Sequence, residues 1–335
     1  MDIFLNKKQW NQFSEKELYQ YIDEVFNYYR KKGFPYFPTD EVFRKKEFEK
    51  FLKVDYLSLY KDDIIGQHMA GLAYCWSFMP HAFNVQCNNL KTPLEVFNND
   101  ELLKKVIYKR IKMGDNMSDN GLRKMLKIFS GTQAVSNFRP TAAAVIYDLY
   151  GKNKNVWDMS AGYGGRLLGA IKAGVKSYIG TEPCTETYNG LLSILQNVQY
   201  WVKSKIEIYK CGSEDFIPEN NSIDLCFTSP PYFDTEKYSN EITQSYKKYP
   251  TKSEWLNGYL RQTFINCYNG LKLNGVIAIN IANVKSYNTL ENDCVKLAEE
   301  IGFKLEKIIK YSLSSLNKNN KYKYEPIFIF RKYYE

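Results

Sequence analysis

The chain has 335 residues, of which 44% are hydrophobic and 25% charged, so collagenous, mucin-like and mostly disordered classes are excluded. At roughly 150 residues per domain, this length predicts two domains, or one large domain with an appendage. Lys and Arg outnumber Asp and Glu by 46 to 37, and the resulting net charge of +9 permits a nucleic-acid partner without requiring one.

The pattern over residues 1–135 predicts a helical N-terminal domain. Ser14 and Glu17 have the spacing of a capping box, and a periodic aromatic stretch follows them. Further helical segments are expected near 41–60, 64–80 and 100–113. We see no two-residue hairpin in this half of the chain.

Residues 136–335 alternate between strand and helix patterns, starting with a short apolar run that ends at Asp158. Strands are expected at Ser177–Thr181, Lys205–Tyr209, Ile223–Thr228, Gly275–Ile281, Phe303–Tyr311 and Glu325–Arg331. Helices are expected at Arg166–Ala173, Thr185–Tyr200, Thr251–Leu271 and Leu290–Ile301. This alternation predicts an α/β fold with a doubly wound, mostly parallel sheet. The last two strands, joined by the polar loop 312–323, predict a C-terminal antiparallel hairpin at an edge.

The cysteines and the apolar stretches indicate the compartment. The seven cysteines include no CxxC pair, which disfavours a disulfide framework or a zinc site, and we expect no metal. The first ten residues lack the apolar run of a secretory signal. The apolar stretch at residues 69–80 is too short for a bilayer of about 30 Å and predicts a buried helix. We therefore expect a cytoplasmic protein without a membrane partner.

A glycine-rich turn follows the strand that ends at Asp158. Its glycines are Gly162, Gly164 and Gly165. Glycines let the backbone approach a ligand closely, and the N-terminus of the next helix offers unpaired N–H donors. Glu182 ends the following strand, where a carboxylate can accept both hydroxyls of a ribose. Leu167 stands where GxGxxG needs its third glycine, which disfavours a nicotinamide cofactor. A structural tight turn with an unrelated Glu182 is the alternative.

Two more segments follow strands at the same expected edge of the sheet. In Cys211-Gly-Ser-Glu-Asp-Phe216 one side chain could bind an adenine ring, although an ordinary Ser/Asp turn has the same composition. In Asp224-Leu-Cys-Phe-Thr-Ser-Pro-Pro-Tyr232 the prolines fix the backbone and remove two N–H donors, which leaves carbonyl acceptors beside a hydroxyl and an aromatic ring. That set suits a planar ring with an exocyclic amine. A rigid strand-ending turn is the alternative.

Together these motifs resemble those of S-adenosylmethionine-dependent amino-methyltransferases, most of all the DNA members that methylate exocyclic nitrogens. The matching pieces are Phe138-Arg-Pro-Thr141, Asp158-Met-Ser-Ala-Gly-Tyr-Gly-Gly165, Glu182, Gly212-Ser-Glu-Asp215 and Thr228-Ser-Pro-Pro-Tyr232. The resemblance covers about residues 137–331. It implies a Rossmann-like methyltransferase domain at 136–335 with S-adenosylmethionine as cofactor. The first 130 residues match no family that we recognise.

The resemblance also implies roles for single residues. The cofactor would be bound by Phe138, Arg139, Thr141, Asp158, Ser160, Gly162, Gly164, Gly165, Glu182, Ser213, Glu214, Asp215 and Thr228. Thr141 would hold the methionine carboxylate, and Asp158 the methionine amino group. Glu182 would bind the ribose, and Glu214 or Asp215 the adenine amine. The catalytic residues would be Ser229, Pro230, Pro231 and Tyr232.

The implied chemistry is in-line transfer of a methyl group from a sulfonium to an amine. Ser229 and the carbonyl of Pro230 would accept hydrogen bonds from the target amine, which localises its lone pair, and Tyr232 would stack on the base. Serine at position 229 favours cytosine N4 over adenine N6. His68 and His81 lie far from the motifs and are expected to be structural.

The implied partner is double-stranded DNA with the target base flipped out of the helix. Basic and aromatic side chains would offset the cost of flipping. Domain 1–135 and the loop 233–253 would form the DNA-facing wall. Candidate contacts in that loop are Lys237, Lys247, Lys248 and Lys252. No nuclease motif is evident, so we expect an orphan or mobile-element modification enzyme rather than a restriction enzyme.

Other functions stay open at this point. An RNA base-amine methyltransferase would share the fold and a similar Pro-Pro turn. Protein amide methylation would prefer Asn at position 229. A non-catalytic DNA-binding protein with a degenerate cofactor fold is a further alternative, which the glycine turn and Glu182 disfavour. The sequence contains no indication of the oligomeric state.

Overall fold

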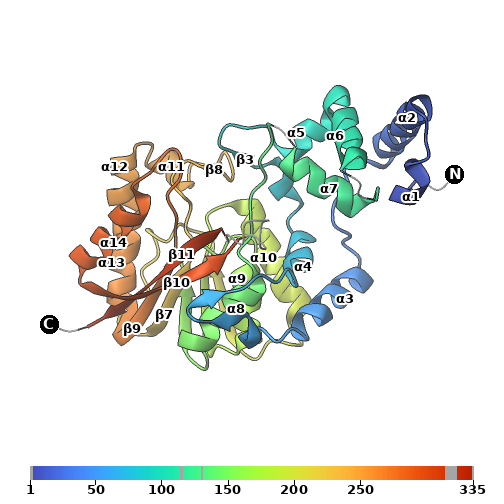
Figure 1. Ribbon diagram of the computed structural model, residues 1–335. Helices are drawn as coiled ribbons and strands as arrows, with labels where there is room; N and C mark the ends of the chain where they lie inside the picture. Colours follow the sequence, from blue (N-terminus) through green and yellow to red (C-terminus); the bar gives the residue numbers. More distant parts are fainter. Residues whose placement is uncertain (1–2, 114–115, 130, 314–322, 334–335) are drawn as a thin grey trace. The chain divides into compact units, whose positions relative to one another are not determined.

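The computed structural model describes residues 3–113, 116–129, 131–313 and 323–333. The chain divides into two compact units (Figure 1). A helical unit holds residues 1–38 and 80–136, and a sheet unit holds residues 39–79 and 137–335. The expectation that residues 1–135 form one domain is therefore wrong for residues 39–79.

The helical unit is built from amphipathic helices around a core of their own. Its elements are α1 (Lys7–Trp10), α2 (Glu15–Lys32), η2 (Pro80–Asn84), β3 (Gln86–Cys87), α5 (Pro93–Asn98), α6 (Asp100–Lys112) and α7 (Asp119–Ile128). The predicted capping box opens α2: the amide of Ser14 donates to the Glu17 carboxylate at 2.7 Å. Tyr21, Val25 and Tyr29 share one face of α2 through their four-residue spacing, and they are buried with side chains from α6 and α7.

The described strands of the sheet unit form one sheet in the order β1-β2-β10-β11-β9-β7-β4-β5-β6. They are β1 (Tyr60–Lys61), β2 (Ile64–Ile65), β4 (Asn155–Asp158), β5 (Ser177–Thr181), β6 (Lys205–Tyr209), β7 (Ile223–Thr228), β9 (Leu271–Asn280), β10 (Phe303–Ser312) and β11 (Tyr324–Lys332); β8 (Glu236–Lys237) lies outside this sheet. Strands β6, β5, β4, β7 and β9 pair in parallel, whereas β11 is antiparallel to both neighbours. The predicted α/β fold is confirmed.

The C-terminal hairpin is confirmed, but it does not stand at the edge of the sheet. Strand β11 lies between β9 and β10, and β10 pairs on its other side with β2. Strands β2 and β1 lie beyond β10, at residues that the sequence analysis expected at the start or end of helical segments. Most of the polar loop expected at 312–323 lies outside the described residues.

Helices cover both faces of the sheet (Figure 1). Successive residues of a strand point to opposite faces. Phe227 of β7 therefore meets Tyr147 edge to face at 5.2 Å, whereas Cys226 packs with Phe264 and Leu297 on the other face. The helices are α3 (Glu41–Leu52), η1 (Leu57–Leu59), α4 (Leu72–Trp76), α8 (Pro140–Tyr150), α9 (Gly165–Ala173), α10 (Thr185–Val198), α11 (Ser245–Lys248), α12 (Lys252–Glu254), η3 (Trp255–Leu260), α13 (Arg261–Gly270) and α14 (Leu290–Ile301). No described helix is both long and apolar enough to cross a bilayer.

Residues 60–65 form the two-residue hairpin that the sequence did not reveal. Asp62 and Asp63 have φ values of 52° and 56°, so both adopt the left-handed conformation of a tight turn between β1 and β2. Ile64 then pairs with Lys310 of β10. The helices expected at 41–60 and 64–80 are shorter than predicted, because they are limited to α3 and α4.

Candidate active site

Two turns singled out in the sequence leave the sheet side by side. Strands β4 and β7 are parallel neighbours, with Val156 opposite Leu225 and Trp157 opposite Cys226. The glycine turn after β4 and the Ser-Pro-Pro-Tyr turn after β7 therefore start at the same carboxyl edge. A hydrogen bond of 3.2 Å from the Thr228 hydroxyl to the Asp158 carboxylate links the two strand ends.

The glycine turn needs its glycines for two different reasons. Gly162 and Gly164 have φ values of 54° and 83°, which favour residues without a Cβ. At Gly165 a Cβ would lie 1.9 Å from the carbonyl oxygen of Phe138, so no side chain fits there. The segment before α8 is thus packed directly against the turn. The Asn137 amide also donates to the Tyr163 carbonyl at 3.1 Å.

Asp158 is fully buried and its carboxylate is already engaged. Arg166 Nε lies 3.0 Å from each carboxylate oxygen, and the Tyr178 hydroxyl donates to Oδ2 at 2.8 Å. The amide of Ser160 donates to Oδ1 at 3.3 Å. A buried ion pair with this many partners fixes the turn to α9. The geometry favours a supporting role for Asp158 over the expected direct contact with methionine. Arg166 was not among the predicted residues.

The side chains of residues 138–141 are also taken up within the protein. Phe138 stacks on Tyr311 with ring centroids 4.7 Å apart. Arg139 donates to the carbonyls of Ser312 and Leu313, and the buried Thr141 hydroxyl donates to the His68 carbonyl at 3.0 Å. The segment expected to bind methionine thus anchors the end of β10 and residue 68. Its contact with the glycine turn runs through the backbone at Phe138.

Glu182 ends β5 next to the glycine turn. Its two carboxylate oxygens accept hydrogen bonds from the amides of Gly162 at 3.0 Å and Cys184 at 2.9 Å. Each oxygen can accept a further bond, so hydroxyls of a ligand can still bind there. Burial raises the pKa of Glu182 to about 7, against the two amide hydrogen bonds, which lower it. Its charge therefore changes near neutral pH.

The acidic segment after β6 offers one unused acceptor. Among the described residues, Oε2 of the buried Glu214 has no hydrogen-bond partner. Lys248 Nζ lies 2.6 Å from Oε1 of Glu214 and 2.7 Å from the more exposed Asp215. Ser213 is buried with its hydroxyl 2.7 Å from that of Thr263. Glu214 is thus better placed than Asp215 to receive an amine. Lys248, expected as a DNA contact, binds these two carboxylates instead.

The Ser-Pro-Pro-Tyr turn ends in a strained residue. Ser229 is half-buried and Pro230 buried. Phe233 follows Tyr232 with a φ of 58°, a conformation that is costly for a bulky side chain. Its ring is buried against Trp255 and Tyr287, with centroids 6.1 and 6.2 Å away. This packing offsets the strain and keeps the turn in one shape.

Tyr232 connects this turn to the strands beside it. Its ring packs against the core, and its hydroxyl lies 3.2 Å from Glu325 Oε2 of β11 and 3.4 Å from Asn280 of β9. Burial and the nearby Glu325 raise the pKa of Tyr232, whereas the Ser229 side chain, which acts on the same hydroxyl, lowers it. The sequence analysis missed Asn280 and Glu325, although an acidic residue opening an apolar strand was a visible signal.

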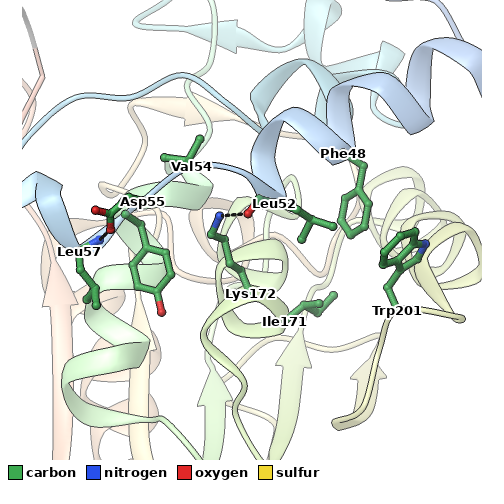
Figure 2. Close-up of a pocket in the computed structure, with 9 residues that line it drawn as sticks. Phe48, Leu52, Val54, Asp55, Leu57, Ile171, Lys172 and Trp201 are labelled. Atoms are coloured by element: carbon green, nitrogen blue, oxygen red, sulfur yellow. Dashed lines mark hydrogen bonds between the residues drawn. The ribbon is translucent and has the colours of Figure 1, made fainter.

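A separate hollow lies away from this edge. It has a volume of about 380 Å³ and lies near the C-terminal end of α9 (Figure 2). The Lys172 ammonium there donates to the carbonyls of Phe51 and Leu52 at 2.6 and 2.8 Å. The hollow is lined by Phe48, Leu52, Val54, Asp55, Tyr56, Leu57, Ile171, Lys172 and Trp201. It shares no residue with the two turns, and its amine supports α3 rather than a ligand.

Residues 223–335 match a family model described as DNA methylase. The matched segment begins with β7 and includes Ser229, Tyr232 and Glu325. The match supports the expected amino-methyltransferase, and with it S-adenosylmethionine as the cofactor. No curated protein matches the sequence.

Several solved structures are similar to part of the chain. A SAM-dependent methyltransferase from Methanosarcina mazei is 11% identical with a TM-score of 0.40, and the similarity covers 57% of this chain and 98% of the other. TrmN from Thermus thermophilus is 16% identical with a TM-score of 0.40, covering 58% and 48%. TYW2 from M. jannaschii, in complex with AdoMet, is 14% identical with a TM-score of 0.39, covering 59% and 78%. The fold assignment rests on the strand order rather than on these similarities.

Proposed function

We propose that the protein is a DNA methyltransferase that transfers a methyl group from S-adenosylmethionine to the exocyclic amine of a flipped-out base. Cytosine N4 is the preferred target and adenine N6 the second. One observation carries this proposal: an amine-accepting Ser-Pro-Pro-Tyr turn and a glycine turn with an adjacent buried carboxylate leave neighbouring strands at one sheet edge. The DNA methylase match over residues 223–335 supports it.

The cofactor half of the proposal rests on unused acceptors. Glu182 would hold the ribose hydroxyls, because its oxygens retain acceptor capacity beside the amides of Gly162 and Cys184. The unpartnered Oε2 of Glu214 would accept the adenine amine. S-adenosylmethionine bound there supplies a methyl group activated by its positive sulfur. The Asp158–Arg166 pair would act indirectly, by keeping the turn in place.

The base half rests on the Ser229 hydroxyl in the turn after β7. Its oxygen has two lone pairs, with which it would accept a hydrogen bond from the target amine. The Pro230 carbonyl would be the second acceptor. Two acceptors outside the ring plane localise the nitrogen lone pair for in-line attack, so that positioning supplies most of the catalysis. Serine at 229 is the reason for preferring cytosine N4.

The test is to incubate duplex DNA, single-stranded DNA and RNA with the full chain and labelled S-adenosylmethionine, and then to identify the modified nucleoside by mass. We expect N4-methylcytosine in duplex DNA. The Ser229→Ala variant should lose at least about a hundredfold in rate, since it removes one of two aligned acceptors, while binding the cofactor as the wild type does.

The other outcomes separate the alternatives. Labelled RNA alone would favour an RNA base-amine methyltransferase. DNA binding without a thermal shift on addition of S-adenosylmethionine would favour a non-catalytic protein. Full activity of Ser229→Ala would remove Ser229 from the mechanism.

A further inference from the structure

A half-buried carboxylate contacts the Ser-Pro-Pro-Tyr turn. Glu325, the second residue of β11, accepts the Tyr232 hydroxyl at 3.2 Å on Oε2. The Asn280 amide lies 3.4 Å from the same oxygen and also donates to the Pro326 carbonyl at 3.0 Å. Glu325 is thus held by neighbours from β9 and from the turn after β7.

Two contacts connect the position proposed for the target amine to this carboxylate. Tyr232 donates to Glu325 at 3.2 Å, and the Ser229 side chain acts on the Tyr232 hydroxyl from three residues earlier in the same turn. Each of the two hydroxyls can receive a proton on its oxygen while it passes its own proton on. The order of these groups is that of a proton relay from Ser229 Oγ through Tyr232 Oη to Glu325 Oε2.

We propose that Glu325 receives, through Tyr232 and Ser229, the proton that the target amine loses on methylation. This inference rests on the proposed function. The amine lone pair forms the new N–C bond while the C–S bond breaks and its electron pair stays on sulfur. The product is a neutral thioether and a cationic methylamine. The proton leaves this nitrogen for Ser229 Oγ, the Ser229 proton moves to Tyr232 Oη, and the Tyr232 proton moves to Glu325, which becomes neutral.

The chemistry requires an acceptor, and the buried carboxylates of the candidate site are committed elsewhere. A serine hydroxyl cannot hold a second proton near neutral pH, so Ser229 can only transmit one. Asp158 is ion-paired with Arg166, and Glu214 with Lys248. Glu182 faces the glycine turn. Of these carboxylates, Glu325 is the one that a hydrogen bond connects to the Ser-Pro-Pro-Tyr turn.

The charged groups around Glu325 set the balance between its two forms. Burial raises the pKa of Glu325, whereas Asn280, Tyr232, Lys323 and Arg139 all favour the anion. Glu236 of β8, whose pKa burial also raises, interacts electrostatically with Glu325 and accepts the Tyr238 hydroxyl. The four neighbours keep Glu325 ionised before the reaction, whereas burial increases its affinity for a proton. Glu325 can therefore take up a proton during turnover and release it later.

The decisive variant is Glu325→Gln in the full chain. Glutamine has nearly the same shape and can still accept the Tyr232 hydroxyl, but it cannot take up a proton. Single-turnover methylation of duplex DNA is measured against pH with saturating labelled S-adenosylmethionine. The wild-type rate should fall at acid pH as Glu325 becomes protonated. At pH values above this fall, Glu325→Gln should methylate at least about tenfold more slowly than the wild type. Its rate should not fall at acid pH. The expected loss is smaller than the roughly hundredfold rate effect of proton transfer that is concerted with bond formation.

Two further variants test the route and the specificity. If Tyr232 transmits the proton, adding Glu325→Gln to Tyr232→Phe should reduce the rate no further. Glu306→Gln on β10 is the control, because this more exposed carboxylate pairs with Arg331 at 2.6 Å, outside the relay. It should keep the wild-type rate and pH profile.

The outcomes distinguish this inference from the proposed function. A Glu325→Gln enzyme with the wild-type rate and acid limb would overturn the relay and leave the methyltransferase intact. A slower variant that keeps the acid limb would show a purely structural role, which also overturns the relay. Wild-type protein that methylates no nucleic acid would overturn both.

Discussion

At the level of a single residue, the proposed ribose contact of Glu182 would link cofactor binding to pH. Burial raises its pKa to about 7, well above the ordinary range of a glutamate. Hydroxyl donors of a ribose favour the ionised carboxylate, so binding and deprotonation reinforce each other. The protonated form, which predominates below the folded pKa, accepts such donors less well.

We therefore predict that the affinity for S-adenosylmethionine rises with pH through about 7 and falls by up to about tenfold per pH unit below it. Calorimetric titrations between about pH 5.5 and 8.5 measure this dependence. Glu182→Gln should bind weakly at every pH and show no such slope. A wild-type affinity that is flat across this range would contradict the ribose role of Glu182.

The sequence predicted some contacts of the candidate site and missed others for a physical reason. Gly162 and Glu182 follow directly from a strand, a turn and their spacing, which are local properties. Glu325 lies 93 residues from Tyr232, and their contact depends on β11 being inserted beside β9. No local pattern encodes that register. The saturation of Asp158 by Arg166 likewise depends on tertiary packing.

Among the elements of the helical unit, α6 carries a group of exposed lysines. Lys105, Lys109 and Lys112 are exposed, whereas Lys104 pairs with Asp23 at 2.7 Å. The sequence analysis proposed the N-terminal region as part of the DNA-facing wall. Within that region we propose α6 as the element that contacts DNA.

We predict that Lys105→Glu, Lys109→Glu and Lys112→Glu together weaken duplex binding roughly tenfold or more. The slope of log affinity against log salt concentration should also become shallower, by about one for each phosphate that the variant no longer binds. Fluorescence anisotropy at several salt concentrations measures both quantities. The control variant replaces the exposed Lys176, Lys203 and Lys304 by glutamate. These lysines lie near the amino ends of the strands β5, β6 and β10. Equal losses in the two sets would refute a specific role of α6.

The strands were easier to predict than the short elements between them. Strands β5, β6 and β7 are predicted with their observed bounds. For β5 and β7 the signal is a largely buried run that ends at a turn, whereas β6 is a partly exposed strand at the edge of the sheet. The β1–β2 hairpin was missed because Asp62-Asp63 lacks the Asn-Gly pattern that marks such turns. The hairpin is stabilised by distant partners: Lys307 Nζ lies 2.8 Å from Asp63.

At the scale of the whole molecule, residues 39–79 bond to the sheet and its helices, although they lie between two segments of the helical unit. Strand β2 pairs with β10, and the Tyr56 hydroxyl donates to Asp148 of α8 at 3.0 Å. Lys172 of α9 donates to Phe51 and Leu52. Composition alone cannot show that residues 39–79 belong to the sheet unit, because their sequence pattern is as helical as that of the residues on either side.

Truncations at two positions should therefore behave differently. Removing residues 1–38 leaves the bonds of residues 39–79 to the sheet and its helices in place, and we expect that protein to bind S-adenosylmethionine. Removing residues 1–130 also deletes β2 and its bonds to β10, and we expect loss of cooperative thermal unfolding and of binding. Calorimetry on both proteins tests this. Normal binding by the shorter protein would show that residues 39–79 are dispensable for the sheet.

The insertion of β11 also has a consequence for biosynthesis. The ribosome makes β10 before β11, yet β11 must enter between β10 and a strand formed earlier. Until residue 332 has emerged, the nascent polypeptide exposes two unsatisfied strand edges and lacks a complete β11 to hold Glu325 in position. A premature stop codon upstream of β11 would thus yield an inert, aggregation-prone fragment rather than a partly active enzyme.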